Sequence, residues 1–249
     1  MSTSFSEESG SWRNWSESWE KHMEFKGSRI PESQVSMHIE EVISQWRKPP
    51  PSNWMRKDLG YIKVKGYRRG DKGRTKLEHR QESILFATPI WRVAGLNEEV
   101  TFIPVLNAVS LANQNTKQRE IDVLGILTFP DHSIPCSVEM KSATTNHAWY
   151  AIVENLQHLK LLHSYPKDFL SNVPNESPCN QFRDLPLSEG WGMVLAPSSF
   201  FNSEGKRENS FRHAKGLIKS IKQRLEVTVL LACLPDDADK PIEVLFHSD

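Results

Sequence analysis

Two carboxylates and a lysine lie among apolar residues in the middle of the chain. Asp122 belongs to a run rich in Ile, Val and Leu, and a second apolar run ends in Glu139 and Lys141. Residues 130–133, Pro-Asp-His-Ser, lie between the two runs and form a turn signal. Two such runs around a turn predict a β-hairpin. The ionisable residues would then lie on neighbouring, largely buried strands.

The spacing of these residues predicts which of them face each other. If the turn is centred between Pro130 and Asp131, counting outward places Asp122 opposite Glu139. Side chains directly opposed in an antiparallel pair lie roughly 5 Å apart at Cβ, and two carboxylates at that distance repel each other. A divalent cation between them would remove the repulsion. Lys141, two residues after Glu139, would add a positive charge on the same face.

Asp122, a hairpin, and then Glu139-Met140-Lys141 before a helix resemble the active site of the PD-(D/E)XK nuclease superfamily. This superfamily includes restriction endonucleases and Holliday-junction resolvases. The resemblance implies that Asp122, Glu139 and the backbone carbonyl of Met140 hold Mg²⁺, with Mn²⁺ as a substitute. It also implies that Lys141 positions or activates the attacking water. Ile121 stands where the family motif has Pro, which is a frequent variation.

Two further site residues are expected from the resemblance. Several branches of the family carry a Gln on the helix that follows the Lys, and Gln157 is similarly placed. An additional Glu on an earlier helix is common, and we take Glu82 as the candidate, with Glu78 on the same helical face as an alternative. His147 and His158 are interpreted as structural or surface groups, because lone histidines near a helix usually are.

The elements around the hairpin indicate the fold. Apolar periodicity predicts a strand in 100–111 before the hairpin. The predicted elements after the hairpin are a helix over 146–162, a strand over 191–196, a helix over 207–225, a strand over 227–234 and an edge strand over 242–246. This order is typical of an αβ sandwich with a mixed central sheet. It also resembles the restriction-endonuclease-like core. The polar stretch 166–187 is expected to be a long functional or mobile loop.

The first part of the chain is expected to form a helical extension. Trp12, Trp15 and Trp19 share one face of a predicted helix, which would dock on the body of the protein or on a protein partner. A second helix is predicted over 32–48, and a run of three prolines follows it as a stiff connector. We therefore predict a helical extension over 1–55 and a nuclease-like domain over 56–249.

Residues 56–80 form the most basic part of the chain. Two interpretations of Arg68, Arg69, Lys72 and Arg74 remain open: an arm that contacts nucleic-acid phosphates, or a solvated loop. Net charge does not decide between them. The formal charge of the 249 residues is zero, so nucleic-acid binding would require a local basic surface.

The composition indicates in which cellular compartment we expect the protein. The three cysteines show no zinc-ligand spacing, which favours reduced thiols in the cytoplasm. The sequence contains no long apolar run and no basic-then-apolar leader, so we expect no membrane association.

The resemblance implies a metal-dependent nuclease that hydrolyses phosphodiester bonds, with DNA favoured over RNA. One alternative is a catalytically silent nuclease-fold subunit that serves as a binding or scaffold module in a nucleic-acid-processing complex. Another is a plain αβ domain in which Asp122, Glu139 and Lys141 form a structural ion network.

Overall fold

A computed structural model describes residues 4–23, 31–50, 76–110, 120–142, 147–201 except 174 and 176, and 206–248. The longer helices are α1 (Ser4–Met23), α2 (Glu32–Arg47), α3 (Lys76–Ala87), α4 (Ala148–Ser164) and α7 (Lys206–Leu225). The short ones are α5 (Pro166–Asn172), α6 (Ser198–Phe201), η1 (Cys179–Asp184) and η2 (Leu187–Glu189). The strands are β1 (Trp91–Ala94), β2 (Val100–Ser110), β3 (Glu120–Thr128), β4 (Ser133–Met140), β5 (Trp191–Ala196), β6 (Val229–Cys233) and β7 (Ile242–Phe246). No helix in these ranges is both long enough and apolar enough to cross a membrane.

The strands form a closed, mixed barrel in sequence order from β1 to β7. Strands β1 to β4 are antiparallel neighbours, β4–β5 and β5–β6 are parallel, and β6–β7 is antiparallel. Parallel pairing of β7 with β1 closes the sheet, with Val93 opposite Ile242. The open αβ sandwich expected from the sequence is therefore wrong. Strand β7, which we expected at an edge, is paired on both sides.

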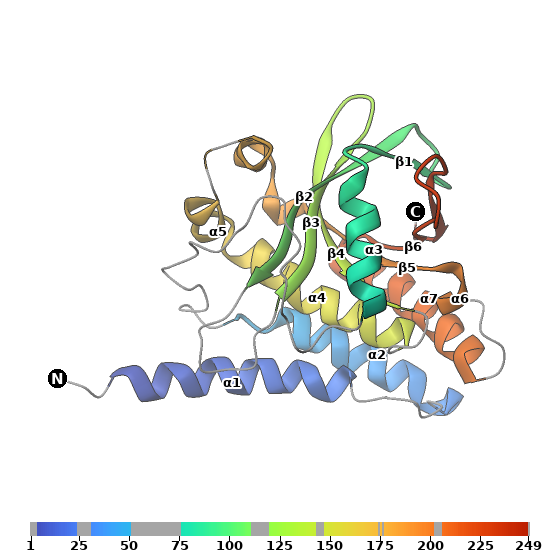
Figure 1. The fold of residues 1–249 in the computed structure, drawn as a ribbon. Coiled ribbons are helices and arrows are strands. Elements are labelled where there is room, and N and C mark those ends of the chain that lie inside the picture. Colours follow the sequence, from blue (N-terminus) through green and yellow to red (C-terminus); the bar gives the residue numbers. More distant parts are fainter. Residues whose placement is uncertain are drawn as a thin grey trace.

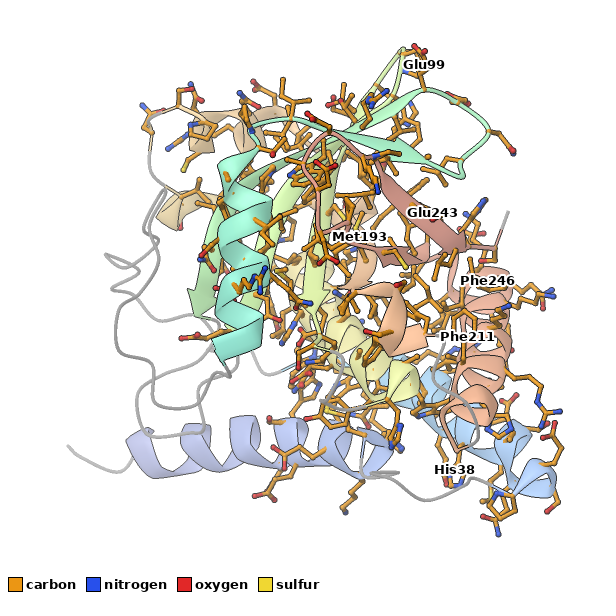
Figure 2. The ribbon with its side chains drawn as sticks, turned by 45° about the vertical axis from the view of Figure 1, so that its right-hand side comes forward. His38, Glu99, Met193, Phe211, Glu243 and Phe246 are labelled. Atoms are coloured by element: carbon orange, nitrogen blue, oxygen red, sulfur yellow. The ribbon has the colours of Figure 1, made fainter. Side chains whose placement is uncertain are left out.

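Gly95 allows the close approach of β1 and β7. Its φ angle of +89° lies in the region that side chains rarely adopt. A Cβ atom at this position would lie 2.5 Å from the carbonyl oxygen of Val244. Closure therefore depends on a residue without a side chain immediately after β1. Figure 2 shows the closing region, with Glu243 on β7 and Glu99 immediately before β2.

Each barrel strand contributes to an apolar cluster that fills the interior. One residue from each strand illustrates it: Trp91, Phe102, Val123, Val138, Met193, Leu230 and Ile242. Since all seven strands meet in this cluster, it lies inside the closed sheet. Leu85 of α3 joins it, and the indole N–H of Trp91 donates a hydrogen bond to the Leu85 carbonyl (2.8 Å). Helix α3 thus packs on the barrel, as Figure 1 shows.

A second, larger apolar cluster lies between the outer face of the barrel and the remaining helices. Helix α4 packs against β4 and β5, and α7, α1 and α2 pack against α4. Figure 1 shows α4 between the strands and the two N-terminal helices. Near β7, the Lys215 ammonium lies 4.5 Å from the ring centroid of Phe211 and 5.4 Å from that of Phe246. Figure 2 labels both rings where α7 meets β7. It also labels His38 on α2, below these rings in that view.

The N-terminal helices share the core of the barrel domain. Trp15 and Trp19 are buried in the second cluster, which confirms that these two indoles dock on the body of the protein. The side chain of Trp12 lies outside the described residues. The Trp149 indole of α4 donates a hydrogen bond to the backbone carbonyl of His22 (3.1 Å), which fixes α1 on α4. The domain division at residue 55 and a protein partner on this face stay predictions.

The stretch 166–187 differs from the long loop that the sequence predicted. It contains α5, η1 and the start of η2. Phe169, Cys179 and Phe182 are fully buried in the second cluster. Prolines and asparagines suggested a loop, but these three apolar side chains hold the segment on the helical layer.

Candidate functional site

The central hairpin forms with the predicted register. Thr128 lies opposite Ser133 and Val123 opposite Val138, so the turn is centred between Pro130 and Asp131. One step further in this register, Asp122 is level with Glu139. Both residues lie on the sheet face that packs against α4, since their alternate neighbours Leu124 and Ser137 face that side.

Asp122 is fastened to the end of β4. Its Oδ2 atom accepts a hydrogen bond from the Met140 backbone N–H (2.8 Å). The N–H and C=O groups of one strand residue point to the same neighbouring strand. The Met140 carbonyl therefore also faces β3. On its other edge, the chain is held to β5 by the Lys141 N–H, which donates to the Leu195 carbonyl (3.0 Å).

Lys141 bridges two buried carboxylates. Its ammonium lies 2.5 Å from Oε1 of Glu139 and 2.8 Å from Oε2 of Glu154 on α4. The exposed fractions of the three side chains are 8% for Lys141, 4% for Glu139 and 15% for Glu154. Water therefore screens these charges weakly, and the ion pairs are stronger than surface pairs.

One stripe of α4 faces this cluster. Tyr150, Glu154 and His158 follow each other at intervals of four residues, so they share a helical face. The Lys141 ammonium lies 5.7 Å from the ring centroid of Tyr150, and His158 Nδ1 lies 3.5 Å from Oε2 of Glu139. The helix supplies an aromatic ring, a carboxylate and an imidazole around the two strand residues.

A buried amide docks α4 on the sheet. Asn155 donates from Nδ2 to the carbonyl oxygens of Ser137 on β4 (2.9 Å) and Met193 on β5 (3.4 Å). Gly192 leaves room for this amide, because a Cβ atom there would lie 2.3 Å from Asn155 Oδ1. The neighbouring Glu154 is therefore placed by a fixed helix.

The cluster carries more negative than positive charge. Burial raises the pKa of Glu139 well above its usual value, and the negative charges of Asp122 and Glu154 add to the effect. Burial also opposes ionisation of Glu154, but the charges of Lys141 and His158 lower its pKa to about 2. Burial would lower the pKa of Lys141, yet the surrounding carboxylates raise it well above its usual range. Lys141 is thus held as a cation between Glu139 and Glu154.

The chemistry of the site fits a hard divalent cation. Oε2 of Glu139 is buried and makes no hydrogen bond within the described residues. Asp122 is half-buried and lies level with it in the hairpin. No group of three or more His, Cys, Asp or Glu side chains in the described part of the chain is arranged to hold a metal ion. A site of two carboxylates, completed by waters, suits Mg²⁺ better than metals that require full protein coordination.

Of the other predicted site residues, the structure describes Gln157 and Glu82. Gln157 is fully buried, and its amide nitrogen lies 3.4 Å from Ser16 Oγ of α1. The structure therefore places this amide against the N-terminal extension. Glu82 is buried on α3, which packs against β4. Its role as an additional site carboxylate stays a prediction. Arg68, Arg69, Lys72 and Arg74 lie outside the described residues.

Sequence reasoning missed Glu154, and it left open whether His158 is a structural or a surface group. His158 is 1% exposed and next to Glu139, so it belongs to the cluster rather than the surface. A signal for both was present, because polar residues at i, i+4 and i+8 form a stripe on a helix that is otherwise largely apolar. The packing of that stripe against β4 shows which charged residues it contacts, and the sequence alone does not.

No family model, curated protein or solved structure matches this chain. The functional argument therefore depends on the geometry and chemistry of the site.

Proposed function

We propose that the chain is a Mg²⁺-dependent nuclease that hydrolyses phosphodiester bonds, with DNA as the favoured substrate. The observation that carries the proposal is the arrangement of Asp122, Glu139 and Lys141 on one face of the hairpin, with Oε2 of Glu139 free of hydrogen bonds. The choice of substrate rests on the resemblance of these residues to the PD-(D/E)XK site pattern. It does not rest on the fold, because the closed barrel differs from that family's open sandwich.

The two strand carboxylates would hold the cation, and the carbonyl of Met140, the residue after Glu139, would complete the ligand set that the resemblance implies. When bound, a divalent cation polarises the scissile phosphate and lowers the pKa of a coordinated water. Hydrolysis would join a water oxygen to phosphorus and break the bond from phosphorus to the leaving oxygen, which takes up the proton that the water loses.

Lys141 would act as a cation rather than as a base. Its pKa is raised by the carboxylates around it, so it remains protonated. An ammonium group at this position orients the attacking water and stabilises the negative charge that builds up on the phosphate oxygens. Lys141 would therefore not serve as a general base.

The experiment is a cleavage assay on linear and supercoiled DNA, single-stranded DNA and RNA, with Mg²⁺ or Mn²⁺. Wild type is compared with Asp122→Asn and Lys141→Ala, and metal binding is measured by calorimetry. Asp131→Asn is a matched control, because Asp131 belongs to the same hairpin but has an 81% exposed side chain. We expect Asp122→Asn to lower the cleavage rate by about a thousandfold and Asp131→Asn to leave it unchanged.

Three other outcomes are informative. Absence of both metal binding and cleavage would contradict the proposal and favour a structural ion network, for which the short Lys141 bridge provides the geometry. Metal binding without cleavage would favour a catalytically silent subunit. Equal activity in wild type and Asp122→Asn would place the reaction elsewhere on the chain.

A further inference from the structure

Lys141 has two carboxylate partners, and the binding of a divalent cation would affect the two ion pairs differently. Glu139 belongs to the hairpin and would turn an oxygen towards the cation together with Asp122. Glu154 comes from α4, and its Oε2 atom accepts a second hydrogen bond from the same ammonium at 2.8 Å. Two cations that share one carboxylate repel each other, and in a buried site this repulsion is weakly screened. The ion pair between Lys141 and Glu139 would therefore weaken when the cation arrives.

From this geometry we propose that Glu154 is a positioning residue that keeps Lys141 in the site while Glu139 binds the cation. The inference rests on the proposed metal-dependent function. It assigns the two partners of Lys141 separate tasks: Glu139 holds the ammonium in the metal-free protein, and Glu154 holds it in the metal-bound protein.

Helix α4 is suited to this task because its position does not depend on the hairpin carboxylates. Asn155, the residue after Glu154, fastens the helix to the backbone of β4 and β5. Tyr150, one turn earlier, presents its ring to the same ammonium at 5.7 Å. A carboxylate and an aromatic ring on one helical face both attract a cation. Together they form a position for the Lys141 ammonium that would remain if the Glu139 carboxylate turned towards the cation.

The arrangement also explains why a third buried carboxylate is present. Asp122 and Glu139 already supply two negative charges for a cation, and another carboxylate adds repulsion to Glu139. With a divalent cation bound to Asp122 and Glu139, Glu154 is the carboxylate that remains to pair with Lys141. Glu154 thus balances the lysine rather than the metal.

The test follows the ammonium group of Lys141 by proton–nitrogen NMR, which reports how fast its protons exchange with water. The signal is assigned by its loss in Lys141→Met. Wild type and Glu154→Gln are compared with a chelator and with saturating Mg²⁺. We expect similar protection in both proteins without metal. With Mg²⁺, exchange should be about tenfold faster in Glu154→Gln, since a charge-assisted hydrogen bond is lost.

Two controls separate positioning from a general loss of structure. Glu40→Gln removes an exposed carboxylate of α2 that pairs with Arg224, and we expect no change at Lys141. Glu154→Asp keeps the charge on a shorter side chain and should restore part of the protection; it also replaces Glu154→Gln if that variant does not fold. In the cleavage assay, Glu154→Gln should lower kcat and leave KM for the nucleic acid unchanged, and it should add nothing in the Lys141→Met background.

The outcomes distinguish this inference from the proposed function. Equal protection of Lys141 in Mg²⁺-bound wild type and Glu154→Gln would overturn the inference alone. Weaker Mg²⁺ binding on Glu154→Gln in the Lys141→Met background would make Glu154 a metal ligand and also overturn it. No change in the wild-type spectrum on addition of Mg²⁺ or Mn²⁺ would overturn both the proposed function and the inference.

Discussion

The two faces of β4 are equally buried but opposite in chemistry. Cys136, Val138 and Met140 point into the barrel and belong to its apolar cluster. On the outer face, Glu139 and the adjoining Lys141 are buried against α4 as an ion cluster. Burial of apolar side chains stabilises a fold directly, whereas burial of charges is costly unless they are paired. The interior face thus stabilises the barrel. The charges on the outer face cost free energy when they are buried, so stability alone does not explain why they are present.

The largest expected effect comes from the interior face. Phe102→Ala should lower the free energy of unfolding by about 4 kcal/mol, because it leaves a cavity in the middle of the closed sheet. Guanidinium-induced unfolding followed by near-ultraviolet circular dichroism measures the change. Ile90→Ala is the control, since Ile90 is 56% exposed and should alter stability little. Similar values for the two variants would contradict a packed barrel interior.

The outer face should respond to loss of its cation. In a chelator, Lys141→Met is expected to lower the free energy of unfolding by about 3 kcal/mol, because Glu139 and Glu154 then lie buried without a positive charge. Added Mg²⁺ should recover part of this loss, as measured by urea unfolding with and without the metal.

The control for this prediction is Arg224→Met. Arg224 forms an exposed ion pair with Glu40, and its loss should matter much less. If Lys141→Met left stability unchanged, the three charges would not form the tight cluster described above.

A smaller effect tests the other end of α4, where a polar group is buried neutral. Burial lowers the pKa of His163 from 6.5 to about 4, and the hydrogen bond to the Gly190 carbonyl opposes this only in part. The unfolded chain therefore binds the proton more tightly than the folded protein. The stabilising contribution is complete above pH 6.5 and is lost as the pH falls towards 4. Between pH 7 and pH 5 the loss should be about 2 kcal/mol.

Urea unfolding at several pH values, with wild type and His163→Gln in parallel, isolates this contribution. The variant lacks the imidazole, so the difference in stability between the two proteins should change across this pH range. A constant difference would show that His163 binds protons equally in the folded and unfolded states.

The smallest effect concerns Gln157. Because its amide lies against Ser16 of α1, Gln157→Ala should lower the free energy of unfolding by about 1 kcal/mol and leave the cleavage rate within about threefold of wild type. Ser16→Ala should have a similar effect on stability. A hundredfold loss of cleavage at unchanged stability would instead support the catalytic role inferred from the sequence.

The hairpin and the register of its charges could be predicted from local sequence patterns. Turn residues between two apolar runs are local signals, and the alternation of side chains then places Asp122 level with Glu139. Strand β5 and the helices α2, α4 and α7 were also predictable to within a few residues, because each has a clear apolar period.

The closure of the sheet and the composition of the charged cluster could not be predicted in this way, because both depend on contacts between distant segments. Closure depends on pairing between β1 and β7, two short strands far apart in the chain, and on the backbone of Gly95 against Val244. No local pattern encodes such a pairing. Similarly, the stripe that contains Glu154 and His158 is visible in the sequence, but its meaning comes from docking through Asn155. Spacing along the chain fixes which side chains share a face, whereas packing between distant segments decides what that face meets.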